Sequence, residues 1–244
     1  SDAPKLSTIS LVASKTGKVE LGDVGSNTSV EDLQSISIVS SGADVALGSI
    51  ISSNTGTFKV EIASSSLVSI GNLNFQNAGT LFEVSGSGTL APLSFVNEAY
   101  LSINLSDLVT NANVSFVNAT SDVTVVLGSG NDTVALGLGS DVVKGGDGLD
   151  TFVIGNGSSG LSPDKADIIS DFQSASDKLK LGFAGDGTVD IGNYVVSSSS
   201  VADYSAALVA ANSALAALNS SSAASELYAF EYDSGSGYLF IDNN

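Results

Sequence analysis

The feature that most limits the fold is an unbroken nine-residue repeat between Leu127 and Val153. Each of its three copies carries two glycines and one aspartate at the same spacing. Glycine permits the positive φ of a tight turn, and the residues after each aspartate suit a short strand. Two such turns close one coil, so turns 18 residues apart should lie one above the other. The sequence therefore predicts a β-solenoid with these repeated positions: Gly128, Gly130 and Asp132; Gly137, Gly139 and Asp141; Gly146, Gly148 and Asp150.

The repeated turns offer the hard oxygen ligands that Ca²⁺ prefers. Each turn presents backbone carbonyls and one carboxylate, which is too few for one ion, whereas two stacked turns supply about six to eight oxygens. We therefore expect one site where the Asp132 turn meets the Asp150 turn. A second site on the opposite edge should pair the Asp141 turn with Thr120–Asp122 or with Gly155–Gly157.

The residues before the repeat show short apolar alternations separated by Gly, Ser and Asn, which are typical of strands with one buried face. Their buried positions recur with gaps of 24, 22, 21 and 20 residues, at Ile38, Ile62, Val84, Leu105 and Val125. This spacing favours a parallel β-helix with one coil per gap. A β-sandwich, whose strands also recur regularly, is the alternative for this part of the chain.

The residues after the repeat change character. Val201–Leu218 has apolar residues every three or four positions and predicts a helix. Leu227–Tyr232 and Tyr238–Ile241 alternate around Asp233–Gly237 and predict a β-hairpin. The expected architecture is all-β, with degenerate coils over 1–126, a calcium-binding roll over 127–182, and a C-terminal capping or secretion region over 183–244 that holds the short helix and hairpin.

Composition excludes several classes of function. The net charge is -18, with 8 lysines and no arginine, so nucleic acid is not expected as a partner. Cys and His are absent, which removes the thiolate nucleophile, the imidazole base and the usual zinc ligands. No apolar run approaches the length of a membrane span, and no membrane insertion is expected. The remaining enzyme class would use paired carboxylates, but the dense acidic cluster is the repeat itself. We expect no enzyme activity.

The segment Gly145–Val153 matches the pattern G-G-x-G-x-D-x-U-x at every fixed position, so residues 127–181 resemble the repeats-in-toxin (RTX) family. The stretch from Asp167 to Phe172, followed by Asp177-Lys-Leu, is similar to the sequence that closes the roll in secreted RTX proteases. That resemblance implies that Asp167 and Asp171 complete the last calcium site and that Phe172 caps the core. Capping of a helix or strand by aspartate is the simpler alternative.

The RTX resemblance also implies a secreted bacterial protein. It implies export in an unfolded state by type I secretion machinery, and folding by Ca²⁺ outside the cell. The expected function is structural, in a surface layer, an adhesin or a biofilm matrix, with self-association into an array or filament and cell-surface polysaccharide as a further partner. The alternative is the C-terminal export-and-folding module of a larger secreted RTX hydrolase.

Overall fold

The computed structural model describes most of the chain and divides it into two compact units. The units are Ser1–Lys180 and Leu181–Asn244. The described residues are 7–13, 17–24, 33–52, 56–64, 66–75, 80–96, 101–117, 119–155, 157–160, 162–181, 194–221 and 227–242.

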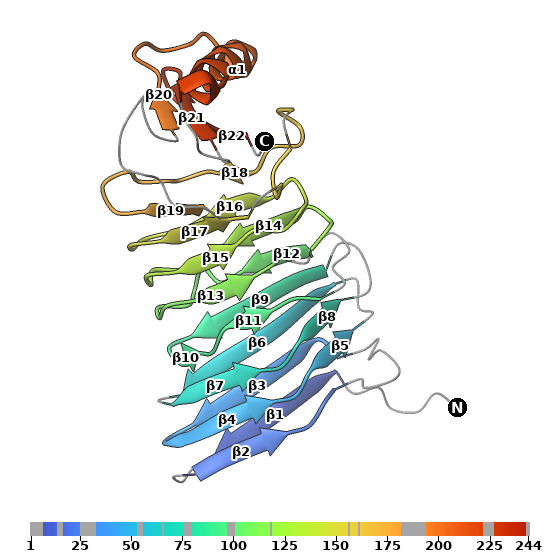
Figure 1. Ribbon diagram of the computed structural model, residues 1–244. Coiled ribbons are helices and arrows are strands. Elements are labelled where there is room, and N and C mark those ends of the chain that lie inside the picture. Colours follow the sequence, from blue (N-terminus) through green and yellow to red (C-terminus); the bar gives the residue numbers. More distant parts are fainter. Residues whose placement is uncertain are drawn as a thin grey trace. The chain divides into compact units, whose positions relative to one another are not determined.

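The first unit is a parallel β-solenoid, as predicted (Figure 1). Its long sheet has eight strands in the order β1-β3-β6-β9-β12-β14-β16-β18, and every neighbouring pair is parallel. Their bounds are β1 Thr8–Ala13, β3 Ser35–Ser40, β6 Thr57–Ser64, β9 Thr80–Gly86, β12 Leu101–Asn104, β14 Val123–Val126, β16 Val142–Lys144 and β18 Ile168–Ile169.

Three smaller sheets close the coils. The second sheet has the order β10-β7-β4-β2, the third β11-β13-β15-β17-β19, and a pair joins β5 to β8. Their bounds are β2 Gly17–Leu21, β4 Ala43–Leu47, β5 Ile50–Ser52, β7 Leu67–Ile70, β8 Leu73–Phe75, β10 Thr89–Leu90, β11 Leu93–Ser94, β13 Asn113–Ser115, β15 Thr133–Ala135, β17 Thr151–Ile154 and β19 Lys178–Leu181. The second sheet ends at β10, so the coils that follow have two strands each and become a flat roll.

The strand register confirms the solenoid but corrects two of the predicted coil lengths. Ile38 lies opposite Ile62, as expected. Ile62, however, lies opposite Gly86, and Val125 lies opposite Ile103, so the markers Val84 and Leu105 are each displaced by two residues. A shift of two residues keeps a side chain on the same face of a strand, so the hydrophobic pattern alone cannot detect it.

The core is a continuous column of inward side chains. Its largest members are phenylalanines whose ring centroids lie 5.1 to 6.5 Å apart, within one coil or between neighbouring coils: Phe58, Phe75, Phe82, Phe95 and Phe116. All of them are essentially fully buried. Burying one such ring contributes about 2–3 kcal/mol relative to leaving it exposed. This shared column shows that the described residues of 1–126 continue the solenoid instead of forming a sandwich.

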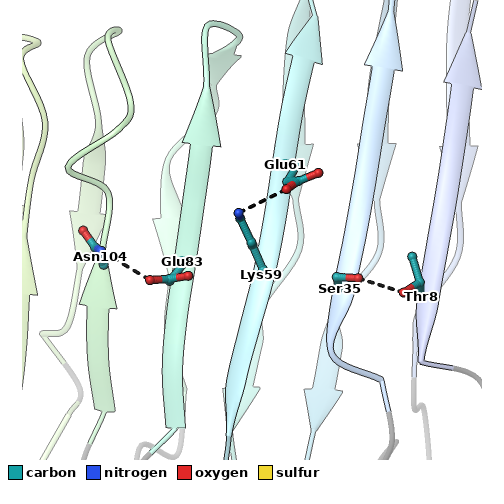
Figure 2. Close-up of polar contacts among 6 residues, drawn as sticks. All are labelled: Thr8, Ser35, Lys59, Glu61, Glu83 and Asn104. Carbon is teal, nitrogen blue, oxygen red and sulfur yellow. Dashed lines mark hydrogen bonds and ion pairs between the residues drawn. The ribbon is translucent and has the colours of Figure 1, made fainter.

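Many outward side chains of the long sheet are polar, although Val12, Val39, Val142 and Ile168 are also exposed on its strands. Figure 2 shows contacts between neighbouring side chains here: Thr8 Oγ1 with Ser35 Oγ at 2.9 Å, Lys59 Nζ with Glu61 Oε1 at 3.1 Å, and Asn104 Nδ2 donating to Glu83 Oε1 at 3.4 Å. Exposed pairs of this kind contribute at most about 1 kcal/mol each. Their main effect is to keep this face solvated, which fixes the apolar face inward.

The second unit contains the predicted helix and hairpin. Its elements are β20 Tyr194–Val196, α1 Tyr204–Ser221, β21 Leu227–Tyr232 and β22 Gly237–Asp242. Strands β21 and β22 are antiparallel, and α1 packs against them through Ala207, Ala211 and Leu215. The helix begins at Tyr204 instead of Val201 because Asp203 is its N-cap, accepting the Ala206 amide at 2.9 Å.

Two predictions for this region fall partly outside the described residues. Ser220 and Ser221, expected in a linker, belong to α1, and positions 222–225 of that linker are not described. Positions 183–193 of the predicted C-terminal region are not described either. In the part of the chain that the structure describes, no helix is long and apolar enough to cross a membrane.

Candidate metal centre

The predicted metal-binding turns lie along two edges of the roll. We call the connections from the long sheet to the third sheet the first edge, and the connections back to the long sheet the second edge. The first edge comprises 105–112, 127–132, 145–150 and 170–177, and the second comprises the described residues 116–117, 119–122, 136–141, 155, 157–160 and 162–167.

Turns 18 residues apart stack directly on the first edge. A Cβ placed on Gly146 would lie 2.0 Å from the carbonyl oxygen of Gly128, and one on Gly148 would lie 2.0 Å from that of Gly130. Both upper glycines also have positive φ, of 89° and 140°. Only glycine fits such a close backbone approach at positive φ. The structure thus brings together the two turns that the sequence paired.

The repeat aspartates of the first edge form a series of hydrogen bonds from side chain to backbone between successive coils, which we call a ladder. Asp132 Oδ1 accepts the Ala112 amide at 2.7 Å, and Asp150 Oδ1 accepts the Asp132 amide at 2.9 Å. Asp177 Oδ1 then accepts the Asp150 amide at 3.2 Å. Asp132 and Asp150 are each 1% exposed. Each carboxylate therefore ties its own turn to the turn of the preceding coil.

The second edge repeats this arrangement around Asp141. Its Oδ1 accepts the Val123 amide at 3.0 Å and its Oδ2 the Gly137 amide at 3.1 Å, while its own amide donates to Asp167 Oδ1 at 3.0 Å. A Cβ on Gly139 would lie 2.5 Å from the carbonyl oxygen of Ser121.

Of the two partners expected for the Asp141 turn, the structure therefore places Thr120–Asp122 beneath it. A Cβ on Gly155 or Gly157 would meet no atom within 4 Å, so neither glycine packs directly onto the Asp141 turn, although Gly157 lines the same pocket as Gly139 and Ser140. Asp167, which lies further along the same connection, contacts the Asp141 turn directly, since its Oδ1 accepts the Asp141 amide.

Asp167 and Asp171 do not share one site, which corrects the expectation from the sequence. They flank β18, which has two residues, so they lie at opposite ends of a strand. Asp171 belongs to the first edge, where its two oxygens accept the Gly145 and Gly146 amides at 2.8 and 2.9 Å. Phe172 is 38% exposed, and its ring centroid lies 6.0 Å from that of Phe152. It covers the end of the core in part.

The sequence did not lead us to expect a second series of hydrogen bonds between coils, nor the part that Asp177 plays in the series formed by the repeat aspartates. Asn111 Oδ1 accepts the Asn131 amide at 2.9 Å, and Asn131 Oδ1 accepts the Leu149 amide at 3.0 Å. Asp122 plays the same role on the second edge, accepting the Ser140 amide at 2.8 Å. In the sequence, the members of this second series could have been recognised as an Asn or Asp directly before a residue of the first series. Asp177 was visible only as part of the closing sequence.

Three buried carboxylate oxygens in these ladders have no hydrogen-bond donor among the described residues. They are Asp132 Oδ2, Asp150 Oδ2 and Asp167 Oδ2. The Gly128 amide lies near Asp132 without reaching hydrogen-bond geometry. A buried unpaired carboxylate oxygen is costly unless a cation accompanies it. The side chains present therefore fit a cation that prefers oxygen ligands.

The site would depend largely on the backbone. Within the described ranges, no three acidic side chains converge into a metal cage. Carbonyl groups of the stacked turns would have to provide most of the ligands, as the sequence led us to expect.

The comparisons with known proteins decide the family. Residues 80–227, more than half of the chain, match the family model described as Peptidase M10 serralysin C terminal. The chain belongs to this family. No curated protein and no solved structure matches it.

The Peptidase M10 serralysin C terminal match covers every residue singled out for metal binding. It starts at Thr80, the first residue of β9, and ends at Leu227, the first residue of β21. The family is the RTX-type calcium-binding repeat region of secreted bacterial proteins, which confirms the RTX resemblance at that level. Strands β1 to β8 precede the matched region.

Burial shifts the ionisation of the ladder carboxylates. It raises the pKa of Asp132, Asp141 and Asp150 above the ordinary value, although amide donors oppose the shift. Burial also raises the pKa of Asp167 to about 7, with the Asp141 charge adding to the effect. Without a cation, the charged forms of these side chains are therefore disfavoured in the folded roll.

We predict that the pH dependence of stability changes sign with calcium. Between the aspartate pKa of the unfolded chain and about pH 7, the folded state in calcium-free buffer binds more protons than the unfolded state. The free energy of unfolding should therefore be greatest near pH 4 to 5 and fall as pH rises through 7. In millimolar Ca²⁺, protons compete with the ion, so stability should rise over the same range. Between pH 5 and 7.5, we expect the melting temperature to fall by roughly 5 °C without calcium and to rise by roughly 5 °C in millimolar Ca²⁺.

Asp167→Asn is the matched control, because it keeps an acceptor for the Asp141 amide and removes the titrating group. It should flatten the calcium-free slope. Thermal melts that change in the same direction with and without calcium would contradict the prediction.

Proposed function

We propose that this chain is a calcium-dependent structural protein of the bacterial cell surface, whose roll folds when Ca²⁺ enters the stacked turns outside the cell. The observation that carries the proposal is the set of three buried carboxylate oxygens without a hydrogen-bond donor among the described residues, which lie on turns that stack between successive coils. When bound, Ca²⁺ supplies positive charge and joins oxygens from adjacent coils.

The chain's own residues have distinct roles in this proposal. Asp132 and Asp150 hold successive turns of the first edge at a fixed spacing, and Asp141 and Asp167 do so on the second edge. The stacked glycines let backbone carbonyls approach the same space. Asp171 fastens the closing segment to the last repeat through the Gly145 and Gly146 amides.

The structural role rests on the continuity of the long sheet. The eight strands of the long sheet, from β1 to β18, are hydrogen-bonded in one continuous series, so ordering the turns around β14 and β16 provides a template for the coils before them. A single solenoid of this kind suits a scaffold. The proposed partners are further copies in an array or filament, type I secretion machinery and cell-surface polysaccharide. In this proposal the chain has no enzyme activity of its own.

Membership of the family supports a second candidate. The chain would then be the export-and-folding module of a larger secreted RTX hydrolase. The 244 residues contain no His, so a zinc-binding H-E-x-x-H helix would have to come from another part of such a protein. Calcium-dependent folding is common to both candidates, and assembly distinguishes them.

We predict that the folded protein self-associates in calcium and not without it. A net charge of -18 opposes close contact between copies over about a Debye length, roughly 8 Å at physiological salt. Each bound Ca²⁺ removes two negative charges and orders the turns. Light scattering and electron microscopy in millimolar Ca²⁺, in Mg²⁺ and in chelator should show assemblies with Ca²⁺ alone. A folded monomer at high concentration in calcium would favour the export-module candidate.

A further inference from the structure

The outer face of the third sheet carries lysine and no acidic residue at its described positions. Its strands follow the order β11-β13-β15-β17-β19, and the last four lie one above another in Figure 1. Alternate residues face the core, namely Leu93, Val114, Val134, Phe152 and Leu179. The outward residues are Ser94, Asn113, Ser115, Thr133, Ala135, Thr151, Val153, Lys178 and Lys180. In a chain of net charge -18, this face is therefore locally basic.

The lysines on the other outer faces are paired with acidic residues. On β2 and β6, exposed lysines form ion pairs with exposed glutamates: Lys18 with Glu20 and Lys59 with Glu61. No described acidic residue forms an ion pair with Lys178 or Lys180. These two charges are therefore available to a partner.

Four outward side chains form a row across the strands. Asn113 lies opposite Thr133, and Thr133 lies opposite Thr151. The Lys178 amide donates to the carbonyl of Asp150 at 2.8 Å. The Thr151 amide makes the equivalent bond to the preceding coil, so Lys178 faces Thr151 as Thr151 faces Thr133. Neighbouring strands lie about 4.7–4.9 Å apart, so the row repeats at that spacing.

The polar groups of this row are not used inside the solenoid. The side chains of Asn113, Thr133 and Thr151 form no hydrogen bond with any residue that the structure describes. By contrast, polar side chains on the outer face of the long sheet contact one another (Figure 2). The row on the third sheet therefore offers hydroxyl, amide and ammonium groups to a ligand.

The carboxylates nearest the row do not cancel its charge. Asp150 is 1% exposed. Asp177 immediately precedes Lys178. Its Oδ1 accepts the Asp150 amide at 3.2 Å, and its Oδ2 accepts the Gln173 amide at 2.8 Å. Because both carboxylates are held by the backbone of the turns and neither forms an ion pair with the lysines, the face keeps its positive charge.

We propose that this face, which we call the third-sheet face, binds an acidic polysaccharide that runs across the strands. The inference rests on the cell-surface polysaccharide in the proposed function, and it names the surface and the chemistry of that partner. Lys178 and Lys180 attract the anionic groups as point charges. The Asn113 amide and the threonine hydroxyls donate and accept hydrogen bonds, which suits sugar hydroxyl groups. The equal spacing of the row lets successive sugars meet successive coils.

The charge of the whole chain directs a polyanion to this face. The acidic remainder of the surface repels such a polymer over about a Debye length, roughly 8 Å at physiological salt. The third-sheet face lacks acidic side chains among its described residues and has two unpaired lysines. The approach of an anionic polymer is therefore most favourable there.

Binding to three dextrans tests the proposal. Dextran sulfate and carboxymethyl dextran carry anionic groups on the same backbone as unmodified dextran, which is neutral. In millimolar Ca²⁺, the wild type should bind an anionic polymer and not the neutral one, and binding should weaken as salt is raised. The anionic polymer that binds more tightly identifies sulfate or carboxylate as the preferred group. Surface plasmon resonance on immobilised dextrans measures these affinities at protein concentrations below those that give assembly.

Matched variants locate the binding surface. Lys178→Gln and Lys180→Gln should each weaken binding about threefold to fivefold. Lys144→Gln removes the same charge from an exposed position on the outer face of the long sheet and should change binding little. Thr151→Val removes one hydroxyl and should weaken binding roughly threefold, whereas Thr124→Val makes the same change on the long sheet and should not. Circular dichroism in calcium confirms the fold of each variant.

Equal losses in the three lysine variants, or equal binding to neutral and anionic dextrans, would overturn the proposal. A folded wild type that assembles in calcium and binds no dextran would also overturn it and leave the proposed structural function standing. If the Lys178 and Lys180 variants then lost assembly, the occupant of the face would be a second copy of the chain. A wild type whose fold and assembly do not respond to calcium would contradict the proposed function itself, whatever its binding to dextrans.

Discussion

Replacing Asp150 by alanine is expected to lower the calcium affinity of the roll roughly tenfold or more. Asp150 is 1% exposed, its Oδ1 holds the Asp132 amide, and its Oδ2 has no donor among the described residues. A Cβ on Gly145 would lie 2.5 Å from that Oδ2, so the first glycine of the complete repeat leaves room for the carboxylate. The substitution removes both a ladder bond and a charged ligand.

Asp122→Ala is the control for Asp150→Ala. It removes the same charge from a half-buried position that is one residue out of register, since Val123 and not Asp122 donates to Asp141. Asp150→Asn adds a second comparison, because it keeps an acceptor for the Asp132 amide and loses the charge. Calorimetric titration should rank the losses as Asp150→Ala, then Asp150→Asn, then Asp122→Ala. Equal losses at positions 150 and 122 would contradict stacking as the basis of the site.

The sequence predicted those parts of the fold that depend on local spacing. The nine-residue repeat determines that Gly146 stacks on Gly128, because two turns of fixed length close one coil. The alternating strands were likewise found from their period of two. The middle strands β4 and β7 and the shifts of register were not predicted, since short strands and steps of two residues leave the hydrophobic pattern unchanged.

The ends of the ladders were harder to predict than their middle. Asp167 and Asp171 were expected in one site because the resemblance to the closing sequence of RTX proteases implied it, but the strand between them carries them to opposite edges. The role of Asp177 depends on a connection of irregular length between β18 and β19, so no fixed spacing indicates it. Sequence periodicity therefore located the turns, whereas the closing segment required the three-dimensional structure.

The second large effect that we expect is folding of the whole solenoid unit by calcium. Without a cation, the ladder carboxylates are buried with raised pKa values, and Asp132 adds to the unfavourable charge around Asp150. Binding an ion that prefers the folded state stabilises it by mass action, by about 4 kcal/mol at a thousandfold excess over Kd. Because the long sheet is continuous, this stabilisation should reach the coils before the repeat as well as residues 120–180.

Mg²⁺ should replace Ca²⁺ poorly, because it demands a tight octahedron and gives up its water reluctantly. A calcium effect that magnesium reproduces at the same concentration would point to general charge screening. The comparison of the two ions therefore separates a coordinated site from a response of the acidic surface.

The most direct test of calcium-driven folding is far-ultraviolet circular dichroism of the wild-type chain during a calcium titration from chelator to millimolar Ca²⁺. We predict a reduced β-signal in chelator and a cooperative gain on adding Ca²⁺, with much less gain in Mg²⁺. A spectrum and melting temperature that are identical in chelator and in calcium would contradict the account.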